Sequence, residues 1–214
     1  IPPTETSFTK YFSRLPADTE VLYHVMVGPG VLTFVKEMGE YLGSKKPQIV
    51  GFIDSLEGVD IASPGLELLE GSYLWEAFPR YANKSAPPYE DLFRKSVGVN
   101  DDGASVDDPK DISTLSHMYG CWETLFVIKK AVEKSGYQKP GDYKGLIQTL
   151  ESLESFPAGI EHPQGPKKVI GKLHQVFGEQ IISKVEKKRL HPVYRTLIED
   201  SLYPPEADYT QRPL

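Results

Sequence analysis

Cysteine is nearly absent from this 214-residue sequence, because Cys121 is its single thiol. One thiol cannot form an internal disulfide or a cysteine-cluster metal site. Cys121 lies in an aromatic-rich pattern with helical spacing, which favours an inert buried side chain over a reactive one. The sequence shows no signal peptide and no apolar run long enough to cross a membrane. It begins at Ile1 without methionine, so we expect it to be a piece of a longer chain.

An excess of positive charge is also missing. The 24 lysines and arginines are outnumbered by 30 acidic residues, and no basic patch interleaved with aromatic residues is present, which argues against nucleic acid as a partner. Lysines do cluster at Lys167–Lys168 and at Lys184–Arg189. We interpret both clusters as solvated edges or turns. With 25% charged and 39% hydrophobic residues, the composition fits a folded soluble protein of one large domain or parts of two.

Catalytic and metal-binding motifs are missing too. The sequence has no G-x-S-x-G motif, no H-E-x-x-H or H-x-x-x-H spacing among its five histidines, and no G-x-G-x-x-G or P-loop pattern. The acidic stretch 100–111 lacks the alternating acidic positions and closing glutamate of an EF-hand loop, so it is interpreted as a solvated loop. We therefore expect no enzyme activity, no metal site and no cofactor.

What the sequence does contain is a strand–turn–helix–strand pattern between residues 20 and 54. Two apolar runs, Val21–Val27 and Ile49–Ile53, have the length of buried strands. A Gly28-Pro29-Gly30 break follows the first run, and helically spaced apolar residues from Val31 to Leu42 follow the break. This order predicts a βαβ unit and hence a parallel sheet with helices on its faces. Ligands bind such sheets outside the carboxyl ends of the strands, here near Met26 and Asp54.

The rest of the chain reads as helices followed by a hairpin. Ser7 is expected to cap a short helix that ends before Pro16, and His24 to be a hydrogen-bonded core or rim residue. The remaining predicted elements are a strand at 73–75, helices at 89–97, 112–134 and 142–153, and strands at 180–185 and 193–198 that are joined by a basic turn. The longest helix has Tyr119 and Trp122 on its apolar face; this face is interpreted as core, with the option that it shows an edge to a ligand.

Several segments in order resemble one protein family. TSFTKYFSRL, ADTEVLYHVMVGPGVLTFVKEMGEYLG, KPQIVGF, LLEGSYLWEAFP, SHMYGCWETLFVIKKAVEKSG and PQGPKKVIGKLHQVFGEQIISKV are similar to successive elements of the type 1 periplasmic solute-binding proteins. More narrowly, they resemble the branched-chain amino acid family, whose members feed ABC transporters. The similarity runs from about Pro3 to Ile198 and corresponds to the C-terminal half of the family's chain.

The resemblance implies an α/β fold: the second lobe of a two-lobed protein, with a parallel sheet flanked by helices, plus helices that return to an absent first lobe. It divides the chain into the main part of the second lobe (1–88), a helical segment that packs on the first lobe (89–166), and returning strands of the second lobe with the tail (167–214). The helix of Tyr119 and Trp122 then needs a partner, either the missing N-terminal lobe or a second chain. The resemblance also implies a periplasmic location and ABC permease subunits as partners.

By the same resemblance, the ligand is a small amino acid or an amphipathic or aromatic acid clamped between the lobes. The implied binding residues follow the first two strands or line the cleft: Met26, Val27, Gly28, Pro29, Asp54, Ser55, Tyr73 and Tyr119. Asp54 either pairs with a ligand ammonium or caps the following turn, and Tyr73 and Trp75 either wall the cleft or pack within their strand. A ligand-sensing regulatory protein of the same fold is the alternative function.

Overall fold

The computed structural model describes residues 5–25, 30–52, 65–112 and 115–212, and these form two compact units. The first unit comprises residues 1–84, 98–116 and 181–195, and the second comprises 85–97, 117–180 and 196–214. The predicted lobe boundaries after residues 88 and 166 concern a two-lobed whole protein and stay a prediction.

The first unit contains a five-stranded sheet with the order β1-β2-β3-β7-β8. Strands β1, β2 and β3 are parallel, as the βαβ pattern predicted, and β7 and β8 complete the sheet in the antiparallel sense. The elements of this unit are α1 (Thr9–Phe12), β1 (Val21–His24), α2 (Gly30–Leu42), η1 (Gly43–Lys45), β2 (Gln48–Phe52), α3 (Gly65–Leu68), β3 (Tyr73–Glu76), β7 (Ile181–Glu186) and β8 (Arg189–Arg195).

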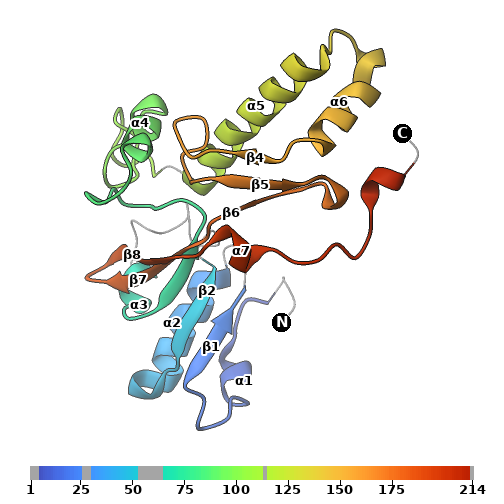
Figure 1. Cartoon of the computed structure of the whole chain (residues 1–214). Helices are drawn as coiled ribbons and strands as arrows, with labels where there is room; N and C mark the ends of the chain where they lie inside the picture. The colour runs from blue at the N-terminus through green and yellow to red at the C-terminus, as the bar shows by residue number, and fades with distance from the viewer. Residues whose placement is uncertain (1–4, 26–29, 53–64, 113–114, 213–214) are drawn as a thin grey trace. The chain divides into compact units, whose positions relative to one another are not determined.

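Helix α2 lies along one face of this sheet and supplies much of the core (Figure 1). Phe34 of α2 is at its centre: its ring centroid lies 5.5 Å from that of Phe8 and 5.3 Å from that of Phe12. Met38, one helical turn further along, is fully buried. Because these residues recur at helical spacing, the sequence pattern alone predicted which face of α2 is buried.

The start of α1 corrects the expected role of Ser7. No side chain at the N-cap position, Phe8, caps this helix. Instead Glu37 of α2 accepts the backbone N–H groups of Phe8 at 2.5 Å and Thr9 at 3.0 Å, and the Ser7 hydroxyl only joins the same carboxylate at 3.3 Å. These bonds lower the pKa of Glu37. The capping group is distant in sequence, so local pattern reasoning could not identify it.

The terminal hairpin is confirmed, but its predicted turn was too long. Strand β8 begins at Arg189, four residues before the predicted start at Val193, and only Lys187 and Lys188 connect it to β7. Both connecting residues have positive φ, 53° and 62°, as a two-residue turn between twisted strands requires. The run of basic residues concealed this turn, because it has neither the glycine nor the asparagine that normally marks one.

The second unit contains a three-stranded antiparallel sheet, β4-β5-β6, that the sequence analysis missed. Its first strand has two residues and the stretch around it is rich in proline and glycine, so it lacks a strand-length apolar run. The elements of this unit are α4 (Pro88–Ser96), α5 (Leu115–Ser135, whose first two residues cluster with the first unit), η2 (Pro140–Asp142), α6 (Tyr143–Glu151), β4 (Ser155–Phe156), β5 (Lys167–Ile170), η3 (Gly171–Leu173), β6 (Gln175–Gly178), α7 (Ile198–Ser201) and η4 (Tyr209–Gln211).

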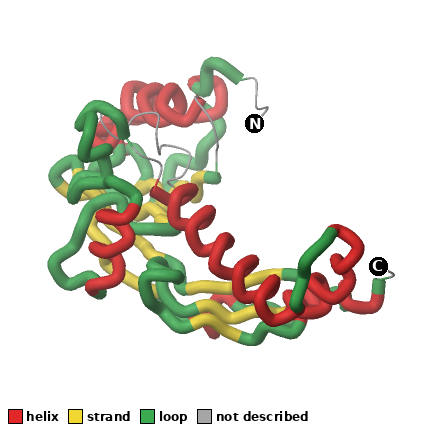
Figure 2. Tube along the Cα trace, turned by 90° about the horizontal axis from the view of Figure 1, so that it is seen from above, coloured by secondary structure: helices red, strands yellow, loops and turns green. Residues whose placement is uncertain are grey.

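Helix α5 is the longest helix and runs unbroken in Figure 2. Its aromatic face is packed within the second unit, because the Trp122 indole N–H donates to the Ile160 carbonyl at 2.7 Å and its ring meets Phe93 edge-on. Cys121 is exposed, which contradicts its expected burial. Leu125 and Ile128 are also exposed, by 65% and 46%. The broad apolar face predicted for α5 is therefore packed at Trp122 but exposed at Leu125.

Candidate functional site

The first three strands of the first unit end at the same edge of the sheet. His24, the last residue of β1, is in register with Gly51, and Phe52, the last residue of β2, is in register with Trp75. Two parallel strands thus run out side by side, as the sequence predicted. In open sheets of this type, ligands bind outside such an edge.

Six of the predicted site residues directly follow these strand ends in sequence. Met26, Val27, Gly28 and Pro29 come after β1, and Asp54 and Ser55 come after β2. All six lie outside the described residues, so their part in a site stays a prediction.

His24, the last residue of β1, is buried in the core. It is 6% exposed, its ring lies 5.6 Å from that of Phe34, and its Nε2 atom has no hydrogen-bond partner among the described residues. Burial lowers the pKa of His24, so the ring is neutral at pH 7. The expected burial is confirmed, and the ring nitrogen without a hydrogen-bond partner among the described residues is Nε2. A Cβ at Gly51 would lie 2.6 Å from the His24 carbonyl oxygen, so this strand pairing requires glycine there.

Phe52 and Trp75 form an aromatic pair at the carboxyl edge, with ring centroids 4.6 Å apart and planes 20° from parallel. Both are half-buried. Tyr73 lies at the start of β3, two residues before Trp75 on the same strand face, and the Lys184 ammonium lies 5.9 Å from its ring centroid. Trp75 therefore lies closer than Tyr73 to the carboxyl end of β3.

Two buried charged residues at the end of β3 were missed in the sequence. Glu76 and Arg80 are each 2% exposed. The Glu76 carboxylate accepts the Arg80 backbone N–H at 2.8 Å and the hydroxyl of Ser183. Gly103, at φ 75°, packs so closely on Arg80 that a Cβ there would lie 2.8 Å from the guanidinium Nε. Buried charges need such specific surroundings, and no local sequence signal marks them in what reads as a loop.

Tyr119, the remaining predicted site residue, belongs to the second unit, where it lies half-buried on α5. The predicted residues that the structure describes, Tyr73 and Tyr119, thus come from different units. Their joint contribution to one ligand site stays a prediction.

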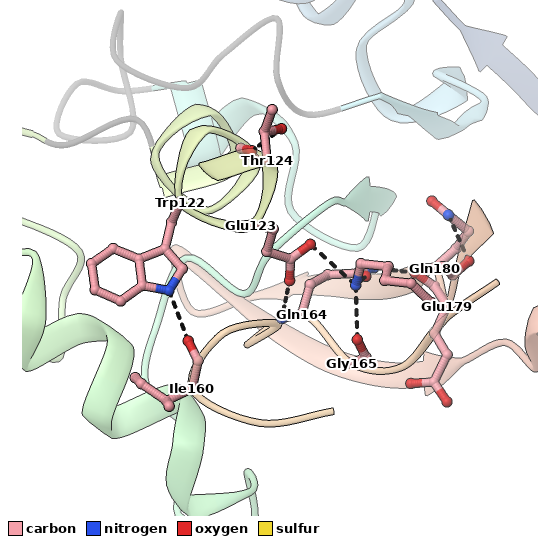
Figure 3. Close-up of polar contacts among 11 residues, drawn as sticks. Trp122, Glu123, Thr124, Ile160, Gln164, Gly165, Glu179 and Gln180 are labelled. Carbon is pink, nitrogen blue, oxygen red and sulfur yellow. Dashed lines mark hydrogen bonds and ion pairs between the residues drawn. The ribbon is translucent and has the colours of Figure 1, made fainter. Parts of the chain in front are cut away.

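A buried polar network holds the second unit together (Figure 3). The Lys167 ammonium lies 3.2 Å from a Glu123 carboxylate oxygen and donates to the Gly165 carbonyl at 2.9 Å. The other Glu123 oxygen accepts the Gln164 backbone N–H at 3.0 Å. Burial raises the pKa of Glu123, although Lys167 and the Gln164 N–H favour its charged form. Lys167 is 8% exposed, so interpreting it as part of a solvated edge was wrong.

Within the described ranges, no group of three or more His, Cys, Asp or Glu side chains is placed to hold a metal ion. In the same residues, no helix is both long and apolar enough to cross a membrane. The described part of this strand edge is therefore aromatic and partly apolar.

Comparison with solved structures shows the class of protein to which this architecture corresponds. No protein-family model and no curated protein sequence matches the chain. Its fold, however, matches that of the type 1 periplasmic solute-binding proteins of ABC transporters, as the sequence resemblance predicted.

Three solved structures illustrate the match. A solute-binding protein of an ABC transporter from R. palustris, in complex with benzoate, matches with a TM-score of 0.64 and 14% identity over 91% of this chain and 48% of its own. The leucine-binding protein LivK from Thermotoga maritima has a TM-score of 0.62 and 15% sequence identity; the match covers 92% of this chain and 50% of that protein. The leucine-, isoleucine-, valine-, threonine- and alanine-binding protein from Brucella ovis has a TM-score of 0.62 and 15% sequence identity; the match covers 94% of this chain and 49% of that protein. The chain spans about half the length of these structures.

Proposed function

We propose that this chain is part of the extracytoplasmic substrate-binding component of an ABC importer. The observation that carries the proposal is the pair of parallel strands ending side by side at His24 and Phe52, in a chain with the solute-binding-protein fold. The protein then acts in the periplasm, delivers its ligand to ABC permease subunits and catalyses no reaction.

The ligand is a small amino acid or an amphipathic or aromatic acid. Met26, Val27, Gly28 and Pro29, which follow β1 in sequence, contact it. Asp54 and Ser55 follow the next strand, and the Asp54 carboxylate pairs with a ligand ammonium. The Phe52–Trp75 pair is positioned on β2 and β3 to supply the apolar wall that such pockets need, with Tyr73 on the same face. The half-buried Tyr119 of α5 is the last residue of this predicted set of ligand contacts.

The first lobe of the whole protein packs on α5. Met118, Cys121, Leu125, Ile128 and Val132 recur at spacings of three and four and therefore share one face of the helix. Leu125 and Ile128 are exposed in this chain, and the matched structures are about twice as long. A contiguous apolar stripe of this kind is normally covered in a soluble protein.

Thermal unfolding of the full-length protein tests the function. Leucine, other amino acids, benzoate and hydroxybenzoates are added singly, and a bound ligand raises the Tm in proportion to RT ln(1 + [L]/Kd). We expect at least one of them to raise it. Asp54→Asn then abolishes the rise for amino acids but keeps it for benzoates, which carry no ammonium group, whereas the exposed Asp101→Asn control changes neither. A panel in which no compound raises the Tm contradicts the proposal.

A further inference from the structure

A cavity of about 480 Å³ lies in the second unit, between α5 and the segment that follows β4. Phe126 and Phe156 are its aromatic lining residues. The segment is held in place by the Trp122–Ile160 hydrogen bond of Figure 3. Gly159 and His162 also exchange backbone hydrogen bonds, at 3.3 and 3.1 Å. The cavity is therefore preformed, and its volume falls within the range of small-molecule sites.

Two polar groups of the cavity flank the same ring. The Lys130 ammonium lies 4.5 Å from the Phe156 ring centroid, and the His162 ring centroid lies 4.6 Å from it. Among the described residues, Lys130 forms no ion pair, whereas the neighbouring Lys129 lies 4.0 Å from Glu133. His162 is only 3% exposed, and its Nδ1 atom has no hydrogen-bond partner in the described part of the chain. A buried polar atom without a partner costs about 1–3 kcal/mol, so a ligand that satisfies it gains affinity.

The charges around His162 favour an anion. Burial, Lys167 and Lys130, in that order, lower the pKa of His162 to about 4, so the ring is neutral at pH 7 and able to donate one N–H. The cavity is also lined by Glu133 and Glu161. These two carboxylates repel anions, and they repel a doubly charged anion more than a singly charged one.

We propose that this cavity binds a monocyclic aromatic monocarboxylate, whose carboxylate accepts hydrogen bonds from Lys130 and His162 while its ring packs against Phe126 and Phe156. Hydrogen bonds from a charged donor to a carboxylate are about twice as strong as neutral ones, and aromatic pairs add specific packing energy. Every residue of this site belongs to the second unit, and none of them is a residue of the strand edge at His24 and Phe52.

The test is an NMR titration of the full chain, labelled on its histidine rings, with benzoate as the probe. His162 reports on the cavity and His24 on the strand edge, and each is assigned from its His→Gln variant. We expect benzoate to shift the His162 signals saturably and to raise the pKa of His162, because the anion stabilises the imidazolium form.

Two further comparisons make the test specific. Lys130→Gln raises the Kd for benzoate, measured from the His162 signals, about tenfold or more. Lys134→Gln, a matched change on the same helix outside the cavity lining, leaves this Kd unchanged. Benzamide, which has the ring without the charge, leaves the His162 signals in place. The proposal is overturned if benzoate moves only His24, if Lys130→Gln has no effect, or if benzamide binds as well as benzoate.

Discussion

The two units of this chain differ in the size of their apolar clusters, and each also contains buried charged residues. In the first unit, helices α1 and α2 press a large apolar cluster, centred on Phe34, against the sheet. In the second unit, an apolar cluster has three buried members among the described residues, Ala131, Leu153 and Phe156. The buried ion pair of this unit joins Glu123 of α5 to Lys167 of β5. A hydrophobic core tolerates some change of shape, whereas a buried ion pair requires both partners in place. The difference predicts which substitutions each unit tolerates.

The largest effect is expected from truncating the centre of the apolar cluster. Phe34→Ala removes a ring in contact with Phe8, Phe12 and His24, and we expect it to lower the free energy of unfolding by about 4 kcal/mol. Tyr23→Ala is the control, because Tyr23 is 74% exposed. Urea unfolding measures both, and equal effects of the two variants would refute the assignment of the core.

Removing one partner of the ion pair ranks next. Lys167→Met leaves the 8%-exposed Glu123 side chain without its cation, so we expect a loss of about 3 kcal/mol. The double variant Glu123→Gln with Lys167→Met keeps an acceptor for the Gln164 N–H without a buried charge, and it should recover most of that loss. If the double variant is as unstable as the two single losses added together, the pair is not coupled and the contrast between the units fails.

A gain in stability is expected from replacing His24 in the first unit. His24→Leu removes a buried Nε2 atom that has no partner among the described residues and keeps an apolar side chain beside Phe34. We expect the free energy of unfolding to rise by about 1 kcal/mol at pH 7. A loss of stability in urea unfolding would mean that the ring makes a bond with residues outside the described ranges.

The second unit also predicts a pH dependence. The pKa of His162 is about 4 in the folded state, below the value of about 6.5 in an unfolded chain. Its contribution to stability is therefore fully present above pH 6.5 and is lost as the pH falls towards 4. We expect the free energy of unfolding to decline less steeply over this range in the His162→Gln variant than in the unmodified protein. The control variant, His191→Gln at an exposed position, should decline as steeply as the unmodified protein. Unfolding curves measured at pH 7.5, 5.5 and 4.5 give the slopes.

The smallest effect concerns the cap of α1. The lowered pKa of Glu37 means that its carboxylate stabilises the folded state at neutral pH and that this contribution is lost as the pH falls through the folded-state value. We therefore expect Glu37→Gln to lower the Tm slightly at pH 7 and to lower it less as the pH falls. Glu40→Gln, on the same helix, serves as the control because Glu40 only pairs with Lys36 at 3.9 Å on the exposed side. A difference that stays constant as the pH falls would assign the effect to shape rather than charge.

Most elements with strong local periodicity were predicted correctly. Helices α2, α4, α5 and α6 and strands β1, β2 and β3 all appear within a few residues of their expected bounds. The short sheet β4-β5-β6 was missed because its strands have two to four residues and alternate weakly. The candidate site was predicted only as an edge: the parallel strands that meet there were recognised, but the stacking of Phe52 on Trp75 was not.

By itself, the sequence determined the βαβ unit, the parallel order of its strands and the edge at which they end, because hydrophobic periodicity and glycine–proline breaks act over a few neighbouring residues. Tertiary structure alone decided that Glu37 caps a helix almost thirty residues away, that Lys167 is buried against Glu123, and that His162 lies beside Lys130 over one phenylalanine ring. Each of these is a contact between segments distant in the chain. Their energies come from burial and charge pairing, which only the folded arrangement creates.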